Sequence, residues 1–331
     1  MKPKVAFIGT GGTISSLGEG PLDIIDYVRH NVRLHADEIV ARYPELVEVA
    51  EVIPVRFRNV PSFDIFFPEW RELVALCDAT VAAHPDLAGI VVGHGTASLE
   101  ETAWMLNLTV KVDVPVVVVG AQRPASALSS DAGMNLLNAV RTAAAPESRG
   151  RGVLVLLNDE IQAAREVTKT STYRMQTFRT PDFGVLGHAD ADRIAYYRRG
   201  ERRTAPDTEF DIRTLPALPR VDIAYAYTGS DGTAVRAFAA AGARGIVSAG
   251  FAPGFPGTAD SAALEQAIAA GITVVQSTRA GSGRTYRGER FQRTGILIAD
   301  NLNPQKARIL LALALTLTSD PAEIARIFAT Y

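Results

Sequence analysis

Near its start the chain reads Val5-Ala-Phe-Ile-Gly-Thr-Gly-Gly-Thr-Ile14, an apolar run that enters a glycine-rich turn with two threonines. A short apolar run that stops at a glycine predicts a buried strand. Open α/β sheets bind their ligands at the carboxyl ends of such strands. Because the glycines let another group approach the backbone closely, we expect the hydroxyl of Thr10 or Thr13 to lie at the mouth of a sheet.

Two nucleotide-binding motifs do not fit this turn. A dinucleotide fingerprint would need a glycine where Ile14 stands, and a P-loop would end in Gly-Lys-Ser or Gly-Lys-Thr. A turn that merely connects a strand to a loop is the remaining alternative to a chemical role.

The same design recurs further along the chain. An apolar run ends in Gly93-His-Gly-Thr96, and Ser98 with Glu101 three places on fits a capping box that begins a helix. Thr96 is therefore expected between the end of a strand and the N-terminus of a helix. The free N–H groups of a helix N-terminus favour negative charge.

Strands and helices alternate along the whole chain. Strands are expected at 49–55, 116–119, 153–157, 222–227, 245–248 and 272–276, and helices at 36–42, 69–83, 131–145, 233–241, 260–270, 304–317 and from 320 onward. This alternation predicts an α/β fold with a large, mostly parallel N-terminal sheet covered on both faces, and a smaller C-terminal α/β domain.

Composition suggests the domain boundaries. An arginine-rich run followed by prolines separates a large catalytic α/β domain (1–194) from a small C-terminal α/β domain (220–331), with 195–219 as the linker. Residues 15–20 contain two glycines and precede Pro21, so they are expected to form a flap over the site.

Charge and cysteine content exclude several kinds of partner. The chain has 34 basic and 36 acidic residues, and this balance offers no electrostatic footprint for nucleic acid or an anionic membrane. Cys77 is the single cysteine, which excludes an intrachain disulfide and a thiolate metal cluster. The histidines lack metal-ligand spacing, so we expect neither metal nor cofactor. Without a signal-peptide pattern or an apolar run of membrane length, we expect a cytoplasmic protein that acts on a small molecule.

Eight segments together carry a resemblance to the bacterial L-asparaginase/glutaminase family. They are Gly9-Thr-Gly-Gly-Thr-Ile14, His94-Gly-Thr96, Glu100-Glu-Thr-Ala103, Gly120-Ala-Gln-Arg-Pro124, Asn135-Leu-Leu-Asn-Ala-Val140, Glu166-Val-Thr-Lys-Thr170, Gly245-Ile-Val-Ser-Ala-Gly250 and Asn303-Pro-Gln-Lys-Ala307. The resemblance covers nearly the whole chain. It implies a homotetramer whose sites form where the small domain of one subunit meets the large domain of another.

The resemblance also implies roles for single residues. Thr13 would attack a carboxamide to give an acyl-enzyme and release ammonia. A threonine hydroxyl needs a base within hydrogen-bond reach, and Tyr27, supported by Glu289, is the expected base. Thr96 and Lys169 would form a second catalytic pair, in which Lys169 must be desolvated to lose its proton near neutral pH. The turn amides around Thr96 suit an oxyanion hole. The substrate-binding positions are Gly12, Ser62, Phe63, Gly95, Ala97 and Gln122.

Three departures from the family pattern concern the substrate's amino-acid end. Ala97 stands where the family has an aspartate that partners the lysine and binds the substrate's α-ammonium, and Phe63 stands where the family has a glutamine. Phe251-Ala-Pro-Gly-Phe255 replaces a Gly-Asn-Gly-Asn segment, whereas Ser62, the carboxylate-binding position, is retained. Each lost charged hydrogen bond is worth about 1.5–3 kcal/mol. We therefore expect a substrate without a free α-amine, such as a substituted amide, a lactam, a cyclic imide or a lactone.

Three alternatives stay open. The chain could be an ordinary L-asparaginase or glutaminase in which Asp64, or Glu289 of the partner subunit, receives the ammonium. It could be a catalytically weak binding or sensing protein, because the lysine has lost its carboxylate partner. It could also be an ammonia-producing subunit of a tRNA-dependent amidotransferase, although the near-neutral charge speaks against an RNA partner.

Overall fold

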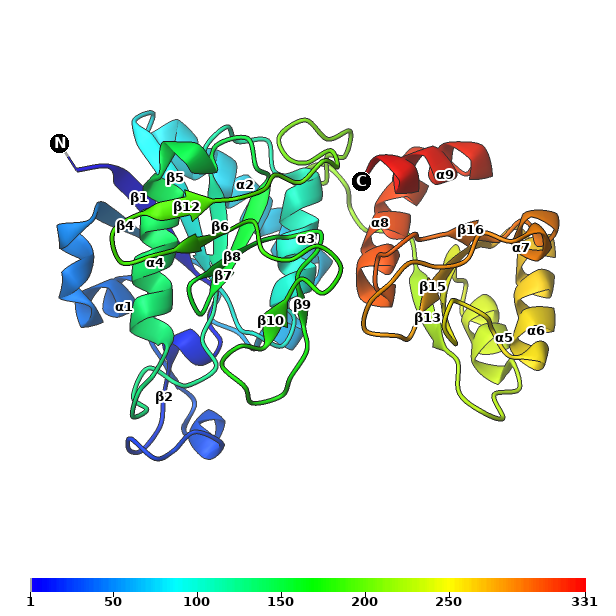
Figure 1. The fold of residues 1–331 in the computed structure, drawn as a ribbon, viewed down its shortest axis with the longest axis horizontal. Helices are drawn as coiled ribbons and strands as arrows, with labels where there is room; N and C mark the ends of the chain where they lie inside the picture. The colour runs from blue at the N-terminus through cyan, green and yellow to red at the C-terminus, as the bar shows by residue number, and fades with distance from the viewer. Residues whose placement is uncertain (1) are drawn as a thin grey trace. The chain divides into compact units, whose positions relative to one another are not determined.

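The chain forms two compact units in a computed structural model that describes residues 2–331, with the backbone only at residue 290. The units are Met1–Thr214 and Leu215–Tyr331. Figure 1 shows helices and strands in each of them. The expected boundaries, with a linker at 195–219, stay a prediction.

An eight-stranded sheet forms the centre of the first unit. Its order is β12-β11-β8-β7-β6-β5-β1-β4. The bounds are β1 Lys4–Gly9, β4 Glu51–Arg56, β5 Leu87–Gly93, β6 Val116–Val119, β7 Val153–Leu157, β8 Glu160–Ala163, β11 Gly187–Ala189 and β12 Ile194–Tyr196. The five strands from β4 to β7 are parallel, and β8, β11 and β12 continue the sheet antiparallel. Gly9 pairs with Gly93, so the two glycine turns leave the sheet at the same edge.

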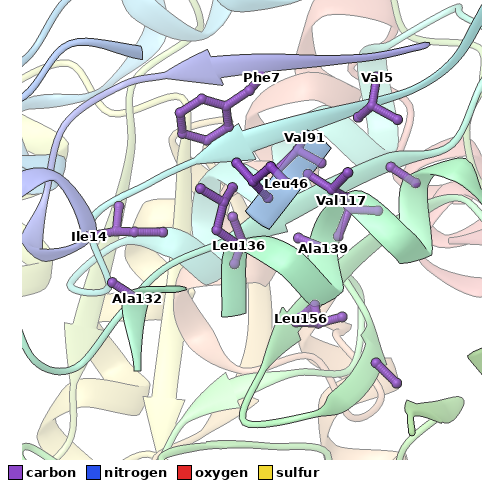
Figure 2. Packing of buried hydrophobic residues seen from close by; sticks show 14 of the residues in the cluster. Val5, Phe7, Ile14, Leu46, Val91, Val117, Ala132, Leu136, Ala139 and Leu156 are labelled. Carbon is purple, nitrogen blue, oxygen red and sulfur yellow. The ribbon is translucent and has the colours of Figure 1, made fainter. Parts of the chain in front are cut away.

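Helices cover both faces of this sheet. On one face, α1 (Ala36–Arg42) and α4 (Ala132–Ala144) pack on alternate side chains of the strands, such as Val5 and Phe7 (Figure 2). On the other face, α3 (Leu99–Thr109) packs against β6 and β7, and α2 (Phe67–Ala83) packs against α3. The predicted large, mostly parallel and doubly covered sheet is confirmed.

The second unit is a smaller α/β unit. Its parallel sheet has the order β13-β14-β15-β16, with bounds Val221–Tyr225, Gly245–Gly250, Thr273–Thr278 and Leu297–Ile298. The helices are α5 Thr233–Ala240, α6 Thr258–Ala269, α7 Glu289–Thr294, α8 Pro304–Leu317 and α9 Pro321–Thr330. The Asp320 side chain caps α9 by accepting from Ala322 N at 3.0 Å.

The remaining regular elements are short. They are β2 Ser16–Leu17, β3 Val32–Arg33, β9 Thr168–Lys169, β10 Phe178–Arg179 and the 3-10 helices Thr13–Ser15, Asp26–His30, Pro44–Glu48, Ser62–Asp64 and Pro146–Ser148. Across residues 2–331, no helix is both long and apolar enough to cross a membrane.

Candidate active site

The turn after β1 is fixed against the end of β5. Thr10 donates twice to the Gly93 carbonyl, from its backbone N at 2.9 Å and from its Oγ1 at 3.0 Å. Gly12 has φ +86°, and a Cβ there would lie 2.2 Å from the Cα of Gly95. Only glycine fits this contact. The turns that carry Thr13 and Thr96 therefore touch.

Ser62 joins the same cluster. A Cβ on Gly95 would lie 2.7 Å from Ser62 Oγ, and Ser98 Oγ donates to the Ser62 carbonyl at 2.6 Å. The predicted capping box is therefore wrong, because the Ser98 hydroxyl serves the Ser62 loop and does not cap the helix. The structure thus brings together three of the predicted substrate-binding positions, Gly12, Ser62 and Gly95.

Thr13 begins a 3-10 helix and faces a hairpin formed by β2 and β3. This hairpin carries Tyr27 in its 3-10 helix, and Thr13 Oγ1 lies 2.8 Å from Tyr27 OH. Backbone groups anchor the hairpin, since Gly18 N donates to Ser126 Oγ and Leu128 N donates to the Pro21 carbonyl, both at 2.8 Å. A hydroxyl with an acid–base group within hydrogen-bond distance is the arrangement that a nucleophile requires.

Thr96 and Lys169 form a second pair. Thr96 is buried at the start of the turn before α3, and Lys169 Nζ donates to its Oγ1 at 2.9 Å. Burial lowers the pKa of Lys169, and the nearby Glu100 carboxylate raises this pKa by a smaller amount. A lysine with a lowered pKa can act as a base closer to neutral pH.

His94 is the first residue of the turn after β5 and is fully buried. Its Nδ1 lies 2.8 Å from the Gly95 carbonyl, and because a carbonyl only accepts, Nδ1 carries the proton. Burial lowers the pKa of His94 to about 4, against a smaller opposing effect of this hydrogen bond. The ring is thus neutral near pH 7 and suited to orient the turn. Among the described residues its Nε2 has no hydrogen-bond partner.

The positions that depart from the family pattern differ in exposure. Ala97 is exposed although the residues on either side of it are buried, and Phe63 is 74% exposed. Gln122 donates its backbone N to Asp131 at 2.9 Å, while its side-chain Nε2 is buried without a partner among the described residues. The methyl of Ala97 is therefore exposed beside Thr96, and the ring of Phe63 is exposed one residue after Ser62.

Glu289 lies in the second unit, at the first position of α7, where it pairs with Arg293 at 3.4 Å. Its expected support of Tyr27 stays a prediction. Within the described part of the chain, no group of three His, Cys, Asp or Glu side chains could hold a metal ion.

Sequence reasoning missed one buried residue of this site, Glu100. Its carboxylate accepts hydrogen bonds from Thr168 Oγ1 and Lys169 N. A usable signal was present, because Glu100 is an acidic residue in the first turn of the helix that follows Thr96.

Comparison with known proteins extends over both units. A family model described as "Asparaginase, N-terminal" matches residues 4–202, and one described as "Glutaminase/Asparaginase C-terminal domain" matches residues 220–328. The chain is 40% identical to "L-asparaginase 2" of Bacillus subtilis (99% of this chain, 87% of the relative) and 38% identical to "Probable L-asparaginase periplasmic" of Haemophilus influenzae (98% and 92%). The crystal structure of a probable cytoplasmic L-asparaginase from Campylobacter jejuni has a TM-score of 0.94 and 35% identity, and the match covers 100% of both chains.

Proposed function

This chain belongs to the asparaginase family of hydrolases, and on that premise we propose that it hydrolyses a small amide with the Thr13 hydroxyl as nucleophile. The observation that carries the proposal is the 2.8 Å contact between Thr13 Oγ1 and Tyr27 OH, in the same cluster of turns as the Thr96 and Lys169 pair. Two proton-transfer pairs suit a reaction in two steps.

In the first step Thr13 Oγ attacks the substrate carbonyl carbon. Its proton passes to the Tyr27 oxygen, and Tyr27 passes its own proton to the leaving nitrogen. The new C–O bond makes an ester on Thr13, and the broken C–N bond of an open-chain amide releases ammonia or an amine. In a lactam or cyclic imide the freed nitrogen stays on the acyl chain, and in a lactone the bond that breaks is C–O and the freed oxygen takes the proton. Backbone N–H groups of the Thr96 turn stabilise the oxyanion, at about 3–4 kcal/mol for each well-placed donor.

In the second step water attacks the ester on Thr13. Neutral Lys169, hydrogen-bonded to Thr96, takes a proton from the water through the Thr96 hydroxyl. The C–O bond to Thr13 breaks, the proton held by Lys169 returns to the Thr13 oxygen, and the carboxylic acid leaves with Lys169 neutral again. The lowered pKa of Lys169, caused by burial, supports this role because the base must be neutral to act.

We propose that the substrate lacks a free α-amine. The exposed methyl of Ala97 supports this, because it offers no charge to an ammonium group at the open side of the Thr96 turn. Ser62 can still bind a carboxylate beside Gly95. Suitable substrates are a substituted amide, a lactam, a cyclic imide or a lactone.

Ordinary L-asparaginase or glutaminase activity is the second candidate. The names of the relatives favour it, and Asp64, in the 3-10 helix that begins at Ser62, supplies a carboxylate near the site.

Succinamate separates the two candidates, because it is asparagine without the α-amine. We expect the protein to release ammonia from succinamate with a higher kcat/KM than from L-asparagine. A kcat/KM for L-asparagine in the ordinary range of about 10⁴–10⁶ M⁻¹s⁻¹, above that for succinamate, would reject the proposed substrate class. It would leave the threonine mechanism in place.

Ala97→Asp should reverse this preference. A restored charged hydrogen bond is worth about 1.5–3 kcal/mol, so kcat/KM for L-asparagine should rise at least about tenfold relative to succinamate. Ala82→Asp, at an exposed position of α2, is the matched control and should not change the ratio. An unchanged ratio in Ala97→Asp would contradict the assignment of position 97.

We further propose a homotetramer in which the partner subunit's Glu289 supports Tyr27. Native mass spectrometry tests the assembly, and Glu289→Gln tests the contact.

The relatives are named for different compartments, and for this chain a cytoplasmic location stays our prediction.

A further inference from the structure

Glu100 connects the two segments that carry the second catalytic pair. It lies in the first turn of α3, four residues after Thr96, and is only 6% exposed. Its Oε1 accepts hydrogen bonds from the backbone N of Lys169 and from Thr168 Oγ1, both at 3.2 Å. One carboxylate thus joins the helix that follows the Thr96 turn to the strand that carries Lys169.

The strand that carries Lys169 does not belong to the large sheet. β9 pairs with β10 in a separate two-stranded sheet. Gln162 of β8 holds the β10 side, because its Nε2 donates to the Phe178 carbonyl at 3.0 Å and its Oε1 accepts from Thr180 Oγ1 at 2.9 Å. On the β9 side, Glu100 provides the corresponding attachment. Glu100 thus holds the backbone of Lys169, whose Nζ donates to Thr96 Oγ1.

The charge of Glu100 also acts on Lys169. A buried carboxylate is costly unless it is hydrogen-bonded and near a positive charge. Position 97 offers only a methyl group, so the negative charge that acts on the Lys169 ammonium comes from Glu100.

We propose that Glu100 is the positioning residue of the Thr96 and Lys169 pair and supplies the carboxylate that position 97 lacks. This inference rests on the proposed role of Lys169 as the base of the second step. Glu100 acts through Lys169 and Thr168 and does not itself touch the substrate.

Two variants separate the charge of Glu100 from its hydrogen bonds. Glu100→Gln keeps an acceptor oxygen for Lys169 N but removes the charge, so neutral Lys169 is favoured. The acidic limb of the kcat profile should move to lower pH by about one unit. Glu100→Asp keeps the charge but is one methylene too short to reach β9. It should lower kcat about tenfold or more with little change in KM, since the pair is misplaced.

Glu69→Gln is the matched control. Glu69 is also a buried first-turn glutamate, in α2, and accepts from Phe66 N at 3.3 Å while pairing with Arg58. Removing the charge of Glu69 should affect the stability of the fold but not the pH profile of kcat.

A chemical measurement keeps this test independent of turnover. The pH dependence of Lys169 acylation by a lysine-reactive reagent, followed by peptide mass spectrometry, reports the protonation of Lys169 in each variant. A downward shift in Glu100→Gln and none in Glu69→Gln is the expected result. Profiles of Glu100→Gln that superimpose on those of the wild type would overturn the inference, even if Thr13 proves to be the nucleophile. If Thr13→Ala keeps full activity while the Lys169 shift is present, the proposed function fails and the Glu100 contact stands.

Discussion

The turns that follow β1 and β5 share one design but hold their threonines in different surroundings. Thr13 contacts a tyrosine hydroxyl on a hairpin whose apolar side chains are exposed, such as Leu22 at 82%. Thr96 contacts an amine, Lys169, held beside the buried carboxylate of Glu100. The contact between the Thr13 and Tyr27 hydroxyls depends on where the hairpin lies. The charge of the Lys169 amine, which is partly buried, depends on pH. In the proposed mechanism the first turn therefore supplies the attacking hydroxyl and the second turn activates water.

The same substitution at the two threonines should give different outcomes. Thr13→Ala removes the nucleophile, so kcat should fall by at least about 10⁴-fold and no burst of ammonia should appear. Thr96→Ala should slow the second step only, so that one equivalent of ammonia is released in a burst before slow turnover. Thr10→Ser, in the same turn as Thr13, keeps its hydroxyl and should remain active. Equal losses without a burst in both alanine variants would show that the two threonines do not act in different steps.

Removal of one hydroxyl from the hairpin should slow the first step alone. Tyr27→Phe should reduce the single-turnover rate of ammonia release by about 10²–10⁴-fold, because general acid–base catalysis contributes on that scale. The exposed Tyr173 provides the control, Tyr173→Phe, with an expected rate near that of the wild type. An unchanged burst rate in Tyr27→Phe would assign the base to another residue.

The contact between the two turns should be sensitive to a single methyl group. Gly12→Ala places a Cβ against the backbone of Gly95 at a positive φ, and should lower the free energy of unfolding by about 3 kcal/mol or more, with loss of activity. Gly20→Ala is the control, because a Cβ there meets nothing within 4 Å. Denaturant unfolding of both variants measures the difference. Equal free energies of unfolding for Gly12→Ala and Gly20→Ala would mean that the fold does not require close contact between Gly12 and Gly95.

The neutral state of His94 should make the fold sensitive to acid. Burial lowers the pKa of His94 to about 4 from 6.5, so the unfolded chain binds a proton that the folded chain excludes. Stability from this residue is therefore present above pH 6.5 and is lost as the pH falls toward about 4, by about 1–3 kcal/mol. Between pH 6.5 and about 4, the free energy of unfolding measured in urea should fall less in His94→Gln than in the wild type.

Much of the fold could be predicted because its signals are local. Apolar runs closed by glycine predicted β1 and β5, and helix α1 agrees with its predicted bounds. The antiparallel edge formed by β8, β11 and β12 was not predicted, since these strands have three or four residues and no clear period. The hairpin strands β2 and β3, at two residues each, were missed for the same reason.

The candidate active site likewise has residues that the sequence predicted and residues that it did not. The resemblance named Thr13, Tyr27, Thr96 and Lys169, and the structure pairs them in the first unit. Ser98 was misinterpreted because the Ser62 carbonyl, 36 residues away in the chain, competes for its hydroxyl. Glu100 was overlooked because its partners lie 68 and 69 residues further on. Contacts at such separations depend on how strands are ordered, which local patterns do not specify.

In the proposed mechanism Thr13 carries the acyl group during turnover. Thr96→Ala, mixed with a small amide such as succinamate and acid-quenched within the burst, allows the adduct to be located by peptide mass spectrometry. The expected result is a mass increase on Thr13 that corresponds to the acyl group. An acyl group found on any other residue would contradict it.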